Sequence, residues 1–138
     1  MDDFPPTLTA LPANDVIADP QSARDEPVNL VRLRGRVTTA PEQRTLPSGT
    51  AIVTFRISVS RGVSPMTSSS KQTVDWVDCA AWGGRVRRSA LGWAVGDVVE
   101  VEGALRRRFY RGANGTATRL EVEALRGRVL VRAPAPAG

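Results

Sequence analysis

The sequence predicts an all-β protein, a five-stranded Greek-key barrel with one short helix after the third strand. Five runs of the chain alternate apolar and polar residues with the two-residue period of a half-buried β-strand. After the glycine pair Gly83 and Gly84, one run instead repeats its apolar residues at helical spacing. A glycine inside the first run, Gly35, fits the bend or bulge that a tightly curved barrel requires.

The first two predicted strands, residues 29–39 and 50–60, each have an apolar face and a basic face. Their aliphatic residues alternate inward, which leaves four arginines pointing outward: Arg32, Arg34, Arg36 and Arg56. Residues 41–49 between the two strands end in a proline-serine-glycine run that is typical of a turn. We therefore predict a connector over residues 41–49.

The third predicted strand, residues 73–82, places Trp76 and Trp82 on the same face. Asp78 lies between them on that face, and an unpaired carboxylate is costly in a dry core. The opposite face, which includes Cys79, suits a core. We interpret the tryptophans as a solvated aromatic face. From this strand alone, two core tryptophans beside a paired aspartate remain an alternative.

The predicted helix ends near Trp93, which continues the apolar stripe of the helix and is expected to lie in the core. The fourth strand follows over residues 97–110. In its second half, Arg106, Arg108 and Tyr110 share one face because they are two residues apart. A glycine-containing turn then predicts a hairpin.

The fifth strand is predicted over residues 116–124 with Leu120 facing inward, and a final short strand is expected at 128–132. The domain boundaries follow from composition. Residues 1–27 are predicted to be a disordered, acidic, proline-rich arm, residues 28–132 the folded domain, and residues 133–138 a short flexible tail.

Charge is distributed unevenly along the chain. Residues 1–26 contain six acids and one base, a net charge of −5, and the whole chain carries +5, so the rest carries +10. A compact domain with such an excess of positive charge points to a polyanionic partner, most often nucleic acid. The alternative at this stage is a basic surface that only confers solubility.

The residue inventory excludes several kinds of site. The chain has no histidine and one cysteine, which excludes a zinc-type metal site and a histidine-based catalytic triad. Asp75 and Asp78 lie on opposite faces of one strand and the other carboxylates are scattered, so a metal-dependent nuclease is not predicted. We therefore expect a protein without enzyme activity, cofactor or metal. No run reaches the length that crosses a membrane, and the acidic N-terminal residues do not resemble a signal peptide.

The order of three strands, a short helix and a hairpin matches the oligonucleotide-binding (OB) fold. In that arrangement the outer faces of the first three strands and the hairpin converge. The arginines and aromatic residues expected on this surface are Arg32, Arg34, Arg36, Arg56, Trp76, Trp82, Arg106, Arg108 and Tyr110. Aromatic rings can stack on unpaired bases while arginines neutralise phosphates, whereas a duplex hides its base faces. The assembled pattern favours exposed tryptophans and a single-stranded nucleic acid.

Several short stretches, in the same order, resemble the bacterial single-stranded DNA-binding protein (SSB) family over residues 27–131. They are Asn29-Leu30-Val31, Gly35-Arg36-Val37, Pro41-Glu42, Leu46-Pro47-Ser48-Gly49-Thr50-Ala51, Phe55, Asp75-Trp76, Trp82, Gly96-Asp97 and Glu102-Gly103-Ala104-Leu105-Arg106. The resemblance implies an OB fold, a homotetramer wrapped by single-stranded DNA, and work in replication, recombination or repair. It also implies base stacking on Trp76, Trp82 and Tyr110. A cytoplasmic, nucleoid-associated location is expected.

Two departures from the family pattern affect this prediction. Residues 62–71 contain no aromatic residue, although some family members stack a base in this loop. The sequence also ends in Pro134-Ala135-Pro136-Ala137-Gly138, without the acidic, aromatic tip through which the main replication proteins recruit enzymes. The resemblance therefore predicts a tailless, accessory-type member, or a phage or plasmid member, rather than the main replication protein. The alternative is an OB-fold adaptor of the primosome type, which mainly holds another protein.

Overall fold

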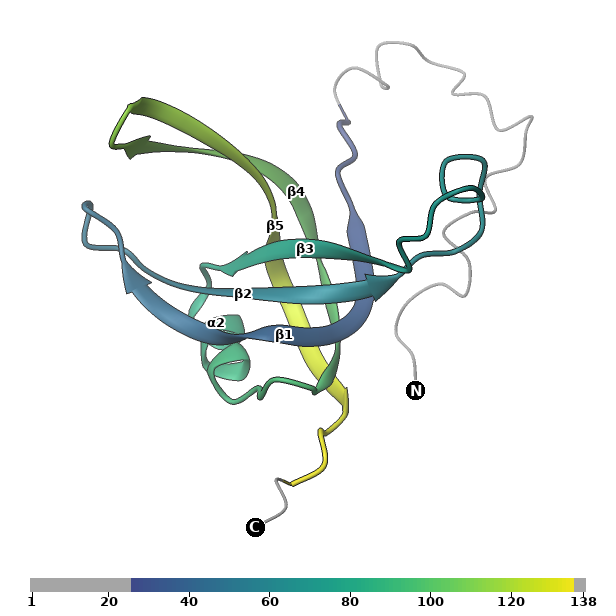
Figure 1. The fold of residues 1–138 in the computed structure, drawn as a ribbon. Helices are drawn as coiled ribbons and strands as arrows, with labels where there is room; N and C mark the ends of the chain where they lie inside the picture. The colour runs from purple at the N-terminus through teal and green to yellow at the C-terminus, as the bar shows by residue number, and fades with distance from the viewer. Residues whose placement is uncertain (1–25, 136–138) are drawn as a thin grey trace.

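The computed structural model describes residues 26–135, and the predicted acidic arm up to residue 25 lies outside the described residues. The described chain forms β1 (Val31–Thr45), β2 (Ala51–Ser60), β3 (Val74–Ala81), α2 (Gly84–Leu91), β4 (Val98–Gly112) and β5 (Gly115–Val131). The strands close into a barrel in the order β1-β2-β3-β5-β4, with only the β3–β5 pair parallel (Figure 1). This confirms the predicted five-stranded OB barrel with one short helix after the third strand. Within residues 26–135, no helix is long and apolar enough to cross a membrane.

The barrel interior is filled by the inward residues of all five strands, and α2 closes one end. Val86 and Ala90 of α2 are buried against the strands. Just beyond the helix, Trp93 is only 6% exposed and its ring meets the ring of Phe55 edge-on, with centroids 5.2 Å apart. Cys79 is also buried, and this burial raises the pKa of its thiol to about 12. Both residues are core residues, as predicted.

β1 differs from its prediction in length and in the position of its irregularities. It continues to Thr45, so the predicted connector is wrong in its first half. Pro41, which has no N–H to donate to a ladder, lies within register shifts between Thr39 and Glu42. No shift occurs at Gly35, although the strand changes its pairing partner from β4 to β2 next to it. A Cβ at Gly35 would lie 2.4 Å from the carbonyl oxygen of Ser58, so close approach of two strands requires glycine there.

β4 and β5 form a long hairpin that extends beyond the barrel, as does the hairpin of β1 and β2 (Figure 1). The predicted short strand at 128–132 is the end of the single strand β5. Leu120 was expected to face the core, but its side chain is 52% exposed. Leu120 lies on the part of the hairpin that projects beyond the barrel, where no core residues cover the side chain.

Candidate nucleic-acid interface

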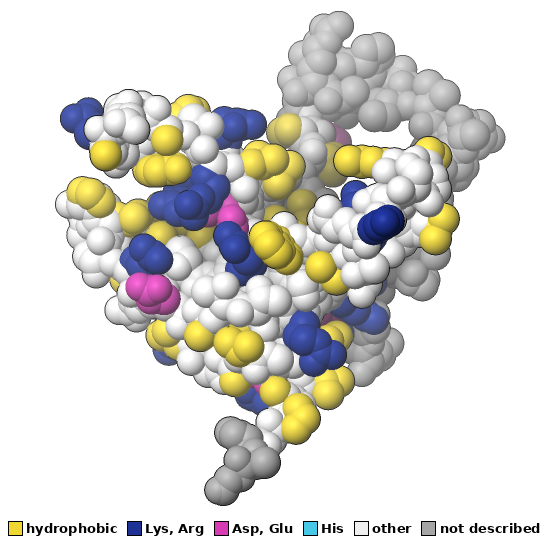
Figure 2. Space-filling view, viewed as in Figure 1, with side chains coloured by type: hydrophobic (Ala, Val, Ile, Leu, Met, Phe, Trp, Pro, Cys, Tyr) yellow, Lys and Arg dark blue, Asp and Glu magenta, His cyan; other side chains and the backbone are white. Residues whose placement is uncertain are grey.

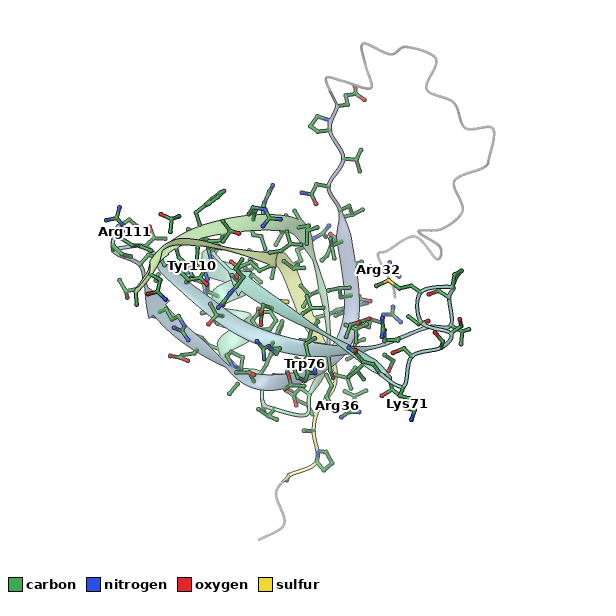
Figure 3. All side chains as sticks on the ribbon, turned by 45° about the horizontal axis from the view of Figure 1, so that its top comes forward. Arg32, Arg36, Lys71, Trp76, Tyr110 and Arg111 are labelled. Carbon is green, nitrogen blue, oxygen red and sulfur yellow. The ribbon has the colours of Figure 1, made fainter. Side chains whose placement is uncertain are left out.

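Trp76 lies on the outer side of the barrel, in a row that crosses three strands. The register pairs Arg36 of β1 with Ser58 of β2, and Ser58 with Trp76 of β3. The Trp76 side chain is 71% exposed, so it is not a core residue. Figure 3 shows Arg36 and Trp76 near each other on this side of the barrel. Arg36 also donates a hydrogen bond to the carbonyl oxygen of Gly96 at 2.8 Å.

The next row along the same strands explains how Asp78 shares a face with two tryptophans. Arg56 and Asp78 are cross-strand partners, and Arg56 Nε donates to Asp78 Oδ1 at 2.8 Å. The guanidinium of Arg56 also lies over the ring of Trp76, 5.6 Å from its centroid. Arg56 therefore satisfies the carboxylate and covers one side of the indole ring. This hydrogen bond with Asp78 raises the pKa of Arg56 above its ordinary value.

The β4–β5 hairpin presents a second group of arginines on the side that we call its front face. Arg106 Nε lies 3.0 Å from Glu123 Oε1, and Arg108 Nε lies 2.6 Å from Glu121 Oε1. Nearer the tip, the guanidinium of Arg119 lies over the ring of Tyr110, 5.6 Å from its centroid. Two-residue alternation places these six side chains on one face of the two-stranded ladder, Arg106, Arg108, Tyr110, Arg119, Glu121 and Glu123.

Trp82 connects the barrel to this front face. It follows β3 directly and its side chain is 38% exposed. It lines a surface hollow of about 300 Å³ together with Arg106, Arg107 and Arg108. Trp76 and Trp82 therefore lie at the two ends of β3, one beside β2 and the other beside the hairpin.

A cleft of about 410 Å³ separates the two projecting hairpins. Arg44 and Thr54 line it from the β1–β2 hairpin, and Arg108, Tyr110 and Arg119 line it from the β4–β5 hairpin. Figure 2 shows arginines and apolar side chains interspersed on this side of the molecule. The turn signals of residues 41–49 predict a connector and therefore do not indicate Arg44 as a site residue. Arg119 is also absent from the predicted site residues, although the alternation of β5 places this arginine outward.

Arg32 and Arg34 lie on the first half of β1, which pairs with β4 instead of β2. Arg34 is 51% exposed and lines a hollow with Arg36 and Ser58 of the Trp76 row. Arg32 and Arg34 both contact Glu100, which is 1% exposed: Arg34 hydrogen bonds to its carboxylate, and Arg32 Nε lies 4.0 Å from it. Arg128 of β5 donates to the same carboxylate at 3.0 Å. Burial alone would raise the pKa of Glu100, but the hydrogen bonds and charges of Arg34 and Arg128 outweigh it and lower the pKa. Figure 3 shows Arg32 further along β1, away from Trp76.

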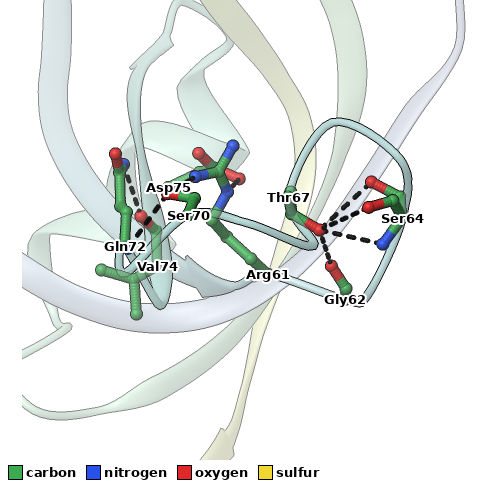
Figure 4. A network of polar contacts seen from close by, with 8 residues as sticks. All are labelled: Arg61, Gly62, Ser64, Thr67, Ser70, Gln72, Val74 and Asp75. Atoms are coloured by element: carbon green, nitrogen blue, oxygen red, sulfur yellow. Dashed lines mark hydrogen bonds and ion pairs between the residues drawn. The ribbon is translucent and has the colours of Figure 1, made fainter.

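The loop before β3 is tied together by its own polar groups (Figure 4). Thr67 Oγ1 donates to the carbonyl oxygen of Gly62 at 2.6 Å and accepts from the Ser64 N–H at 2.9 Å. At the base of the loop, Arg61 Nε lies 3.3 Å from Asp75 Oδ2. The loop contributes no aromatic ring to the interface, and its polar contacts instead fix the start of β3.

Residues 26–135 contain no group of three histidine, cysteine or acidic side chains that could hold a metal ion. The described surface carries four neighbouring features that combine aromatic and basic side chains. They are the Arg36–Trp76 row, the Arg56–Asp78 pair, Trp82, and the cleft between the two hairpins. Such an arrangement can stack planar groups and bind anions at several successive points.

Comparisons with known proteins agree with this geometry. The model of the single-strand binding protein family matches residues 28–129. A single-stranded DNA-binding protein of Bacillus cereus is 31% identical over 88 residues, which cover 64% of this chain and 51% of that protein. Single-stranded DNA-binding protein A of Bacillus subtilis is 32% identical over 88 residues, covering 64% and 50%. The chain thus spans about half the length of these curated relatives.

A solved structure, the Plasmodium falciparum SSB complex with ssDNA, has the same fold. It superposes with a TM-score of 0.60 at 19% sequence identity and covers 77% of this chain and 96% of that chain. The family match spans the whole barrel, from the residues before β1 almost to the end of β5. The chain therefore belongs to the single-strand binding protein family.

Proposed function

We propose that this chain binds single-stranded DNA, without catalysing a reaction, along the outer side of β1–β3 and into the cleft between the two hairpins. The observation that carries the proposal is the exposed Trp76 ring beneath Arg56, which adjoining surface hollows connect to Trp82 and Tyr110. Stacking on such rings tolerates any base sequence, and the neighbouring arginines can neutralise phosphates. The names of the curated relatives support the same function.

Within this proposal, the residues that contact DNA are Arg36, Arg56, Trp76, Trp82, Arg106, Arg108 and Tyr110, together with Arg44 and Arg119. Arg32 and Arg34 contact the Glu100 carboxylate, and Arg34, which also lines a hollow beside Arg36, remains a further candidate phosphate contact. We further propose a homotetramer and a place in replication, recombination or repair at the nucleoid, on the strength of the family membership. Light scattering at micromolar concentration tests the assembly, and a monomer there would contradict it.

The function is tested by fluorescence anisotropy of a labelled oligo-dT of about 70 nucleotides, which is long enough to cover several stacking sites. We expect tight binding, no competition from an unlabelled duplex of equal length, and log K that falls with log salt by about 0.7 per contacted phosphate. Equal competition by duplex and single strand would contradict the stacking mode. An affinity that ignores salt would contradict the role of the arginines.

A further inference from the structure

The β4–β5 hairpin has a second face, opposite its front face, that also combines an exposed aromatic ring with arginines. The ladder from Leu105 to Gly112 is in continuous register with β5, so successive residues alternate between the two faces. By this alternation Arg107, Phe109 and Arg111 lie on the face opposite Tyr110, and Arg107, the nearest of them to the barrel, also borders the hollow beside Trp82. Phe109 is 67% exposed, more than either Tyr110 or Trp82. We call this the back face.

The two faces differ in how their arginines are neutralised. Of the three arginines on the front face, Arg106 and Arg108 each form an ion pair with a glutamate of β5, whereas Arg119 lies over the Tyr110 ring. On the back face, the residues of β5 that lie beside Arg107 and Phe109 are Leu120 and Thr118. Arg107 Nη1 donates to Thr118 Oγ1 at 3.1 Å. Within residues 26–135, no carboxylate forms an ion pair with Arg107 or Arg111.

These differences have a consequence for an anionic ligand. A phosphate that approaches Arg106 or Arg108 must compete with a carboxylate, whereas a phosphate that approaches Arg107 competes only with the neutral Thr118 hydroxyl, and one that approaches Arg111 meets no carboxylate partner among the described residues. The two arginines flank Phe109 at a distance of about 7 Å on either side along the strand. An aromatic ring between two uncompensated cations suits a base with a phosphate before and after it. A basic peptide would need carboxylates to pair with, and the described residues of this face include none.

We propose that the back face is a second binding site for single-stranded DNA, in which Phe109 stacks on a base while Arg107 and Arg111 contact the flanking phosphates. The inference rests on the proposed function, since it extends the same ligand from one face of the hairpin to the other. A strand that occupies both faces passes over the hairpin tip, where Gly112 and Gly115 are paired and close a tight turn. Single-stranded DNA that fills only the front face does not reach Phe109.

The test compares Phe109→Ala with two matched variants, using a short oligo-dT of about 8 nucleotides and a long one of about 70. Phe109→Tyr keeps a stacking ring, and Leu120→Ala removes apolar surface from the same face without removing a ring. With the long strand, we expect Phe109→Ala to weaken binding by about 5- to 150-fold, the loss of one stack. Phe109→Tyr and Leu120→Ala should retain wild-type affinity. With the short strand, Phe109→Ala should have a much smaller effect.

Arg107→Ala and Arg111→Ala should each reduce the slope of log K against log salt by about 0.7 with the long strand. Circular dichroism should show folded variants, because Phe109 and both arginines are exposed. The inference is overturned if the wild-type protein binds the long strand and Trp76→Ala weakens it, but Phe109→Ala does not. A loss of oligomeric state in both Phe109→Ala and Leu120→Ala, with unchanged affinity, would instead assign the face to contact with a second copy. If the wild-type protein binds neither strand, the proposed function itself fails.

Discussion

The base of the barrel, around Trp93, and the outer side, around Trp76, use the same kinds of residue in opposite surroundings. Trp93 is 6% exposed and meets Phe55 edge-on beneath the end of α2. Trp76 is 71% exposed and has the guanidinium of Arg56 over its ring. An indole ring therefore contributes to packing at one place and offers a stacking plane at the other. What decides between the two is whether another element covers the ring.

The charged residues of the two regions show the same contrast. At the base, Asp97 is 1% exposed and accepts hydrogen bonds from the N–H groups of Ala94 at 2.9 Å and Ala133 at 2.7 Å. These backbone hydrogen bonds, with a contribution from Arg132, lower the pKa of Asp97. On the outer side, the Arg56 and Asp78 side chains remain 42% and 32% exposed. A phosphate can reach Arg56, whereas no ligand can reach Asp97 without opening the fold.

The largest expected effect is on stability, at Trp93. Replacing Trp93 with alanine removes a buried ring and leaves a cavity against Phe55, so we expect the free energy of unfolding to fall by about 3–5 kcal/mol. Urea denaturation followed by circular dichroism measures this loss. The protein that remains folded should still bind oligo-dT. A variant of unchanged stability would show that the base is not the packed region.

A smaller loss of stability is expected at Gly127, where β5 passes under the same ring. A Cβ at this position would lie 2.6 Å from Trp93 Cη2, so Gly127→Ala should displace the ring and cost about 1–3 kcal/mol. Combining it with Trp93→Ala provides the control, since removing the ring removes the clash. If the double variant loses as much free energy of unfolding as the two single variants together, the steric explanation is wrong.

On the outer side, Trp76→Ala should leave the free energy of unfolding unchanged, because the ring is largely exposed. It should weaken binding to single-stranded DNA by about 1–3 kcal/mol through the loss of one stack. Anisotropy with oligo-dT measures the affinity, and Trp76→Phe is the matched variant that keeps a ring. An unfolded Trp76→Ala protein would show that Trp76 is a core residue and would contradict its assignment to the binding surface.

The smallest effect concerns salt. Arg56→Ala should make the dependence of log K on log salt less steep by about 0.7, the contribution of one phosphate contact. Arg132→Ala is the control at the base, where the arginine pairs with Asp97 at 3.1 Å. It should leave the slope unchanged. Equal slopes for Arg56→Ala and the wild-type protein would show that Arg56 does not contact a phosphate.

Alternation along the sequence predicts the five strands, and helical spacing predicts the helix and the core position of Trp93. The outward side of Trp76 requires more than alternation: Asp78 on the same face and the arginines of the neighbouring strands. Alternation gives the face of a residue but not its neighbouring strand. The sequence therefore groups Arg32 and Arg34 with the tryptophans but does not predict that their half of β1 pairs with β4 and contacts the buried Glu100.

The residues that sequence reasoning missed have physical explanations too. Arg44 lies on a strand that continues through Pro41 by means of register shifts, which local turn signals concealed. Leu120 alternates like a core residue but lies where the hairpin has left the barrel. Both cases depend on how far a strand extends past its neighbours, and this is a property of the closed barrel and not of any one stretch.

The most direct test of the contrast between the two regions is tryptophan fluorescence during titration with poly-dT. The chain has three tryptophans, so two variants separate the regions: Trp93→Phe keeps the outer pair, and the double variant Trp76→Phe, Trp82→Phe keeps only the base. We predict that poly-dT quenches the emission of Trp93→Phe strongly and saturably, and leaves the emission of the double variant unchanged. Quenching confined to the double variant, or absent from all proteins including the wild type, would contradict the assignment of Trp76 and Trp82 to the DNA-binding surface.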